Sequence, residues 1–142
     1  MPAGAGKGTI SRRVAQALNW AYLDSGALYR AVGIAAAWEG IGLDEPMELA
    51  ACASRTDIKF ISQNIEEPII LINGKEATAD IRSELAGSMA SALAAQPEVR
   101  KALIDLQRSY RKAPGLVADG RDMGTVIFPD APYKFFLTAS AM

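Results

Sequence analysis

A glycine-rich segment near the start of the sequence contains residue types that bind phosphate. Residues 4–9 read Gly4-Ala5-Gly6-Lys7-Gly8-Thr9 and directly precede a stretch with helical periodicity. Glycines let backbone N–H groups curl around phosphate oxygens, the N-terminus of a helix adds partial positive charge, and a lysine reaches the terminal phosphates. The segment is therefore predicted to be a phosphate-binding loop.

This loop departs from the full motif in two ways. Met1 stands where the full pattern has its first glycine, and no strand precedes the loop in this sequence. Gly8 occupies the place where many phosphate loops carry a magnesium-binding Ser or Thr, and Thr9 follows one step later. In this form the loop resembles those of small-molecule kinases that act on nucleoside monophosphates. The alternative interpretation, a flexible glycine-rich start, is disfavoured by Lys7 and by the helix that follows at once.

A second group of polar residues follows the short apolar run 21–23. Asp24 and Ser25 end this predicted strand and suit the N-cap of a helix. Arg30 lies about one and a half turns further along that helix. We expect it to face the same cleft as the phosphate loop. Taken alone, the motif is better explained as an N-cap followed by a solvated arginine.

A third group lies where the apolar run 116–118 ends, in the sequence Asp119-Gly120-Arg121-Asp122. The carboxyl ends of strands in a parallel sheet are where ligand-facing groups are placed. Asp119 can hold Mg²⁺ through water, and the planar guanidinium of Arg121 can neutralise phosphate charge. In isolation, a salt-bridged structural loop is the alternative.

Together, the order and the residues of the three segments resemble the signatures of bacterial cytidylate kinases. Those signatures are a GAGKGT loop, a DSGA-x-YR segment and an ADGRDMGT segment followed by VFPDAP. Here residues 126–132 read Val126-Ile127-Phe128-Pro129-Asp130-Ala131-Pro132. The resemblance covers essentially all 142 residues. It implies an ATP-dependent kinase that converts CMP or dCMP to CDP or dCDP, in pyrimidine nucleotide metabolism.

The resemblance also implies roles for individual residues. The loop 4–9 would bind the ATP phosphates, with Mg²⁺ as the accompanying cation. Arg30 and Arg121 would bind the phosphate of the acceptor nucleotide. The ribose would be contacted by Ser25 and Asp122, and the cytosine edge by Ser91 and Arg100. A hydroxyl and a forked donor suit the carbonyl and ring nitrogen of cytosine, whereas uracil presents a different donor pattern.

The predicted chemistry needs no imidazole, and this sequence contains no histidine. The attacking phosphate oxygen already bears charge, so alignment and charge stabilisation dominate phosphoryl transfer. We expect Lys7, Arg30 and Arg121 to provide that stabilisation as the catalytic residues. Cys52 is expected to be a buried apolar residue without a catalytic role.

Composition narrows the remaining classes of function. The chain has 142 residues, is 50% hydrophobic, and carries 15 basic against 16 acidic side chains. Such a balance gives no overall field that would attract nucleic acid or an anionic membrane. One cysteine excludes a disulfide framework. We expect a soluble, cytoplasmic and monomeric protein.

Periodicity predicts alternating helices and strands. Residues 9–19 form a helix whose buried stripe is Ile10, Val14, Ala17 and Leu18. A strand at 21–23, a helix that ends near Gly40, and a short helix from Asp44 and Pro46 to about Ser54 follow. Apolar runs 58–61 and 68–72 and the turn signal Asn73-Gly74 indicate a small antiparallel sheet.

Two helices and two strands complete the expected order. One helix is marked by Ile81, Leu85, Met89 and Leu93, and the next opens at Pro97. Residues 116–118 and 133–137 read as strands. The predicted fold is α/β: a P-loop NTPase-like parallel sheet with helices on both faces. Its core would comprise 1–56 and 114–142, and 57–113 would form an inserted monophosphate-binding lobe of antiparallel β and helix.

Other interpretations stay open at this level. A kinase for AMP, UMP or shikimate would keep the phosphate loop but should change the residues that read the base. The second alternative is a fragment that binds nucleotide without transferring phosphate. In the family, a central strand precedes the loop and a mobile lid follows the last predicted strand. We therefore expect this sequence to be part of a longer enzyme and to have little or no activity alone.

Overall fold

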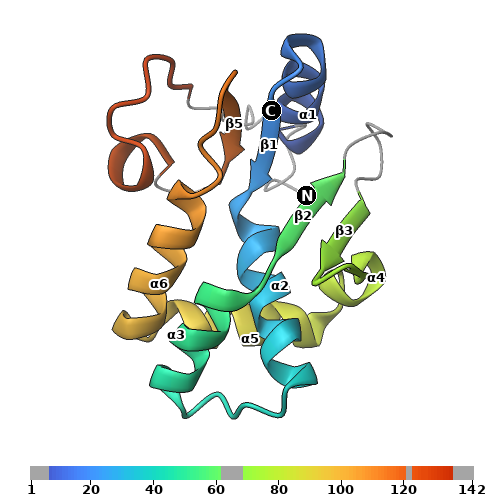
Figure 1. The fold of residues 1–142 in the computed structure, drawn as a ribbon, viewed down its shortest axis with the longest axis vertical. Coiled ribbons are helices and arrows are strands. Elements are labelled where there is room, and N and C mark those ends of the chain that lie inside the picture. Colours follow the sequence, from blue (N-terminus) through green and yellow to red (C-terminus); the bar gives the residue numbers. More distant parts are fainter. Residues whose placement is uncertain (1–6, 62–68, 121–122, 136–142) are drawn as a thin grey trace, which may run out of the picture.

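The computed structural model describes residues 7–61, 69–120 and 123–135. The predicted α/β class is confirmed, because these residues form a parallel strand pair, a small antiparallel sheet and several helices. Figure 1 shows most of the helices gathered at one end of the molecule, with the parallel strands and the first helix at the other. The small antiparallel sheet lies along one side.

The parallel pair consists of β1 (Ala21–Asp24) and β5 (Leu116–Asp119), both of which the sequence predicts. In their register Asp24 stands opposite Asp119, so both strands end at the same edge with a carboxylate. Leu23 is fully buried and Tyr22 is nearly so. The pair therefore brings the second and third polar groups of the sequence side by side.

The first helix, α1 (Lys7–Leu18), forms as predicted, but its predicted buried stripe is wrong. Ile10, Val14 and Leu18 are 49%, 42% and 47% exposed, whereas Ala15 is 1% exposed. Ala17 is also exposed. The helix packs on β1 and β5, and it buries the small Ala15 while the larger apolar side chains stay about half exposed. A helical repeat locates an apolar stripe without saying which neighbour covers it.

The next two helices follow the predicted order. α2 (Ser25–Trp38) is capped by Asp24, whose carboxylate accepts a hydrogen bond from the Ala27 amide at 3.1 Å. Leu28 and Val32 on this helix are fully buried, whereas Trp38 at its end is 43% exposed. α3 (Pro46–Arg55) has proline in its first turn, as predicted.

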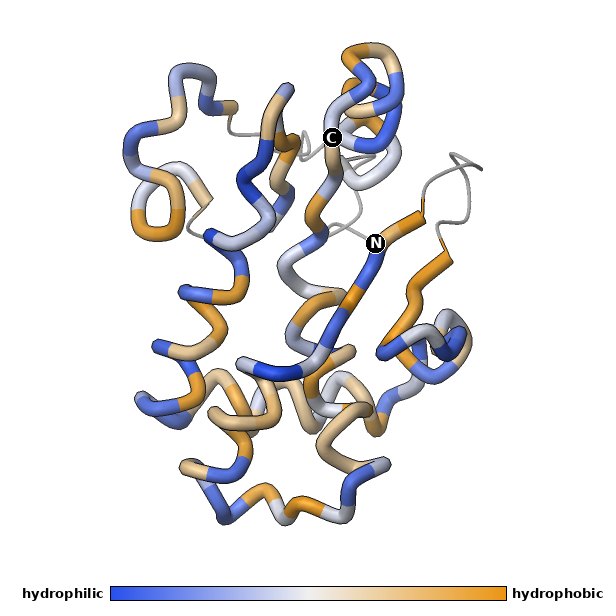
Figure 2. The backbone as a smooth tube through the Cα atoms, viewed as in Figure 1, coloured by the Kyte–Doolittle hydropathy of each residue, from blue (hydrophilic) through white to orange (hydrophobic). Residues whose placement is uncertain are grey.

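The antiparallel sheet contains β2 (Ile58–Ile61), β3 (Ile69–Ile72) and β4 (Lys75–Glu76) in that order, so the predicted sheet is confirmed. Asn73 and Gly74 connect β3 to β4 with φ angles of 51° and 84°. This left-handed pair is the usual conformation of a two-residue hairpin turn. In Figure 2, β3 is coloured hydrophobic throughout, whereas β2 alternates between hydrophobic and hydrophilic colours.

The predicted helix from Ile81 to Leu93 is in fact two helices, α4 (Thr78–Ile81) and α5 (Glu84–Ala94). The break occurs because Ser83 caps a new helix, its hydroxyl accepting from the Ala86 amide at 3.1 Å. Leu85, expected on the buried stripe, is 66% exposed for this reason. The following helix, α6 (Pro97–Arg108), begins at proline as predicted.

One hydrophobic core joins these helices, with α3 packed on α6 and α2 packed on α5. Its largest fully buried apolar side chains are Leu23, Leu28, Leu49, Ile72, Leu93 and Leu103. The core contains residues from the predicted inserted lobe and from the predicted kinase core. The division into two units therefore stays a prediction.

After β5 the chain forms a short π-helix, Met123–Ile127, which the sequence did not predict. Residues 133–135 are not a strand, and Phe135 is 84% exposed. The predicted strand is thus wrong for these three residues; Phe136 and Leu137 lie outside the described residues. Within the described ranges, no helix is long and apolar enough to cross a membrane.

Candidate active site

A cleft of about 430 Å³ lies beside the N-terminal half of α2. Its lining includes three arginines and one carboxylate: Arg12, Arg30, Arg82 and Asp24. Gly26, Ala27, Ile70, Thr78 and Ile81 complete it. The volume is within the usual range for small-molecule sites. Guanidinium groups bind phosphate and carboxylate through paired N–H donors, so the lining favours an anionic ligand.

Arg30 lines this cleft and connects α2 to the α4–α5 segment. Its Nη1 donates to the carbonyl oxygen of Ile81 at 3.0 Å, which uses one of the five guanidinium N–H donors. The group also lies over Gly87 of α5, where an added Cβ would be 3.3 Å from Nη2. The absence of a side chain at Gly87 thus makes room for the Arg30 guanidinium.

Asp119 is the buried acid at the end of β5, with 9% exposure. The Tyr22 hydroxyl donates to its Oδ2 at 3.4 Å. A Cβ added at Gly8, in the first turn of α1, would lie 3.8 Å from the same oxygen. The helix that follows the predicted phosphate loop therefore begins next to Asp119. Lys7 and Thr9 belong to the same first turn of α1, and Thr9 is exposed.

Tyr22 is held in its neutral form by its surroundings. Burial raises the pKa of its hydroxyl above the usual range, and the Asp24 and Asp119 carboxylates raise it further. The Arg12 guanidinium acts in the opposite direction. Because the phenol keeps its proton at neutral pH, it serves as a donor to Asp119.

The chemistry of Asp119 fits a magnesium ion held mainly by water and by substrate phosphates. Its carboxylate is an oxygen ligand beside the start of α1, where a phosphate would lie. No cluster of three or more acidic, His or Cys side chains occurs in the described part of the chain, so a cage built from protein ligands alone is not formed there.

Ser25 begins α2, between the cleft-lining residues Asp24 and Gly26. It is 7% exposed, and its Oγ donates to Oε1 of Gln107 at 2.8 Å. Gly120, with φ of 153°, packs directly on it: a Cβ there would be 2.5 Å from the Ser25 Cβ. A residue larger than glycine at this turn would therefore displace Ser25.

The other predicted residues are not part of this cleft. Ser91 on α5 and Arg100 on α6 are exposed, and neither is among the residues that line it. Gly4, Ala5, Gly6, Arg121 and Asp122 lie outside the described residues. The structure thus brings Asp24, Arg30 and Ser25 together around one end of α2, with Asp119 and Gly8 nearby.

Four residues of this region were not predicted as site residues: Arg12, Tyr22, Arg82 and Gln107. Arg12 lies outside the predicted apolar stripe of α1, and the structure places it in the lining of the cleft. Gln107 carried a detectable signal, since it stands four residues after Leu103 on the apolar side of α6. A buried polar residue on an apolar stripe usually has a specific partner.

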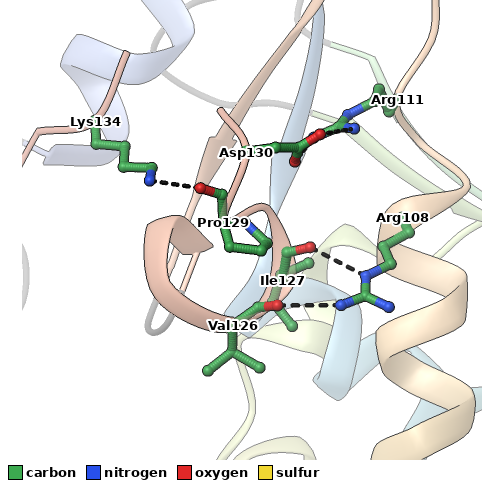
Figure 3. Close-up of polar contacts among 7 residues, drawn as sticks. All are labelled: Arg108, Arg111, Val126, Ile127, Pro129, Asp130 and Lys134. Carbon is green, nitrogen blue, oxygen red and sulfur yellow. Dashed lines mark hydrogen bonds and ion pairs between the residues drawn. The ribbon is translucent and has the colours of Figure 1, made fainter. Parts of the chain in front are cut away.

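The end of α6 anchors the segment that follows the Asp119 turn, as Figure 3 shows. Arg108 donates through Nε to the Ile127 carbonyl at 3.0 Å and through Nη2 to the Val126 carbonyl at 3.1 Å. Arg111 forms a two-bond pair with the Asp130 carboxylate at 3.0 and 2.7 Å. These contacts connect the residues after the turn to the core helix α6.

Comparison with known proteins decides the family. The family model described as cytidylate kinase matches residues 1–142. The chain belongs to the cytidylate kinase family. Two relatives called cytidylate kinase, from Shewanella sp. (strain W3-18-1) and Shewanella putrefaciens (strain CN-32), are each 49% identical over 141 residues. Each match covers 99% of this cytidylate kinase family chain and 61% of the relative's length.

Proposed function

We propose that this chain is the larger part of an enzyme that transfers the γ-phosphoryl group of ATP to CMP or dCMP, giving ADP and CDP or dCDP. The observation that carries the proposal is the arginine-lined cleft beside Arg30, next to the start of α1 and Asp119. A donor site and an anionic acceptor site would then adjoin each other. Membership of the cytidylate kinase family supports the choice of a cytosine acceptor.

At the donor side, Lys7 and the loop that includes Gly4, Ala5, Gly6, Gly8 and Thr9 would bind the ATP phosphates. The start of α1 supports this role because a helix N-terminus attracts anions. Asp119 would hold Mg²⁺, mainly through water. When bound, the cation supplies neutralisation of phosphate charge.

At the acceptor side, Arg30 and Arg121 would bind the CMP phosphate. Ser25 and Asp122 would contact the sugar, and Ser91 and Arg100 the cytosine. Arg30 has support from the structure, since its guanidinium lines the cleft and is placed by α5. Ser91 and Arg100 rest on the family resemblance alone, because neither lines the cleft.

The mechanism requires placement of two nucleotides and stabilisation of charge. The acceptor phosphate oxygen attacks in line, and no general base is needed because that oxygen is already ionised. Lys7, Arg30 and Arg121 would stabilise the transferring group. Residues 57–113 would act as the monophosphate-binding lobe, and residues 1–56 with 114–142 as the kinase core.

The test is chromatographic detection of nucleoside diphosphate after incubation of the longer enzyme that contains this chain with ATP, Mg²⁺ and one acceptor. CMP, dCMP, UMP and AMP are compared in parallel. The proposal predicts formation of CDP and dCDP, with little UDP made from UMP and little conversion of AMP. Equal use of AMP or UMP would point to another acceptor class, and nucleotide binding without product from any acceptor would overturn phosphoryl transfer by that enzyme.

Variants identify the residues responsible. Lys7→Ala, Arg30→Ala and Arg121→Ala should each lower turnover by about 100-fold or more with the fold retained. Arg55→Ala is a matched control, because Arg55 is a half-exposed residue at the end of α3 that pairs with Glu39 and does not line the cleft. Near-normal turnover in any of the three site variants would contradict the assigned role of that residue.

A further inference from the structure

Gln107 is the only fully buried polar side chain among the described residues, with 0% exposure. It lies on α6, 82 residues after Ser25 in the sequence. Its Nε2 donates to the Leu103 carbonyl at 3.1 Å, and its Oε1 accepts from Ser25 Oγ at 2.8 Å. Both ends of this buried amide are therefore used.

The chemistry of these two bonds fixes their direction. A backbone carbonyl only accepts, so the NH₂ end of Gln107 must face Leu103. The carbonyl end must then face Ser25, and an amide carbonyl also only accepts. Ser25 consequently has to donate its single hydroxyl proton to Gln107. The Ser25 oxygen can therefore only accept a hydrogen bond from any other partner, through its lone pairs.

We infer that Gln107 is a positioning residue that fixes the Ser25 hydroxyl as a hydrogen-bond acceptor toward the sugar of the acceptor nucleotide. The inference rests on the proposed function, in which Ser25 contacts that sugar. It predicts that the site selects a donor at the sugar position that Ser25 faces: a hydroxyl satisfies Ser25, whereas a group of the same size without a proton does not.

Packing around Ser25 supports a fixed hydroxyl. Gly120 packs against the Ser25 Cβ so closely that an added Cβ would be 3.3 Å from its Oγ. Ser25 also begins α2, where the Asp24 cap defines the backbone. The serine is thus enclosed by α6, by the Gly120 turn and by its own helix, and its orientation is set before a ligand arrives.

The experiment measures binding of CMP, 2′-fluoro-2′-deoxy-CMP and 3′-fluoro-3′-deoxy-CMP to the chain by calorimetric titration. Fluorine nearly matches the hydroxyl in size but cannot donate. In the unmodified chain, one of the two fluoro analogues should bind about five- to tenfold more weakly than CMP, the loss of one hydrogen bond. Gln107→Met keeps the side-chain length and frees the Ser25 proton, so this penalty should fall below about twofold.

Three further variants separate the role from general damage. In Ser25→Ala the fluoro penalty should vanish, and adding Gln107→Met should change it no further. Gln96→Met is the matched control: Gln96 donates to the Leu43 and Ala92 carbonyls elsewhere in the fold, so its loss should leave the penalty unchanged. Should Gln107→Met fail to fold, Gln107→Leu replaces it.

A second readout does not depend on nucleotide. Thermal midpoints of Ser25→Ala, Gln107→Met and the double variant should be non-additive, because each single change removes the same bond. Additive midpoints would overturn the Ser25–Gln107 pairing. An unchanged fluoro penalty in Gln107→Met would overturn the sugar-reading role. An unmodified chain that binds none of the nucleotides would overturn the proposed function, and the sugar-reading role with it, while the midpoints still report on the pairing.

Discussion

Replacing Gly87 by alanine should stabilise α5 and at the same time weaken acceptor binding. An added Cβ would lie 3.3 Å from Nη2 and 3.6 Å from Cζ of Arg30. Those atoms are the far end of a flexible side chain, so they can move aside by a few tenths of an ångström. The helix itself keeps its position, whereas the guanidinium does not.

The two effects have different sizes and opposite signs. Alanine is favoured over glycine inside a helix by about 1 kcal/mol, and less near the first turn, where Gly87 lies. A net gain of roughly 0.5 kcal/mol should raise the thermal midpoint by about 1–4 °C. A displaced guanidinium loses part of a charge-assisted hydrogen bond worth about 1.5–3 kcal/mol, so CMP should bind roughly three- to tenfold more weakly.

Calorimetric CMP titration and thermal unfolding of the same preparations provide both numbers. Gly33→Ala is the matched control on the facing helix, where the added Cβ would be 2.9 Å from the Cβ of Met89. That atom is attached to the α5 backbone and cannot swing away. Overpacking of about 1–3 kcal/mol should outweigh the helix preference, so Gly33→Ala should destabilise the chain.

The reasoning would be refuted by either of two results. Equal destabilisation by Gly87→Ala and Gly33→Ala would mean that the Arg30 guanidinium cannot move away from the added Cβ. Unchanged CMP affinity in a stabilised Gly87→Ala protein would mean that the guanidinium position over α5 does not govern acceptor binding.

Three other outcomes are expected. Leu103→Ala removes a fully buried side chain and should lower the unfolding free energy by about 2–5 kcal/mol, whereas Leu85→Ala, at a 66% exposed position, should change it by less than about 0.5 kcal/mol in urea titrations. Burial raises the pKa of Tyr22 and of Tyr110, so stability should hold below about pH 10, where the unfolded tyrosines ionise, and fall above it; a flat profile to pH 11 would contradict this. The Arg111 hydrogen bonds lower the pKa of Asp130, so that contribution to stability is present above about pH 4 and lost on acidification, and Arg111→Ala should raise the Asp130 pKa in an NMR titration.

The elements of the fold were largely predictable because their signals are local. The Asp24 cap, the proline that opens α6 and the Asn73-Gly74 turn each act within a few residues, and all three occur as predicted. The errors arose where the spatial neighbours of an element decide which of its side chains are buried. The apolar stripe of α1 is real in sequence, yet Ala15 rather than Ile10 is buried, because the position of the β1–β5 pair selects the face.

The candidate site was predictable only in part, for the same reason. The ends of β1 and β5 brought Asp24 and Asp119 together as the strand order implied. Arg82 lines the cleft and lies in the interruption between helices α4 and α5. The apolar pattern looks continuous there, so the new helix start at the Ser83 cap was not predicted. The partner of Gln107 is Ser25, 82 residues away, and no local pattern predicts that contact.

The hydrogen bond from Arg30 to the Ile81 carbonyl also ranks the ligands that this arginine can bind. An anion that recruits this one donor must outcompete a neutral main-chain acceptor that is already in place. A doubly charged phosphate does so readily, because charge-assisted bonds are roughly twice as strong as neutral ones. A weakly accepting solute leaves this donor on Ile81 and can use only the other guanidinium N–H groups, so it forms fewer bonds with Arg30 than a phosphate does.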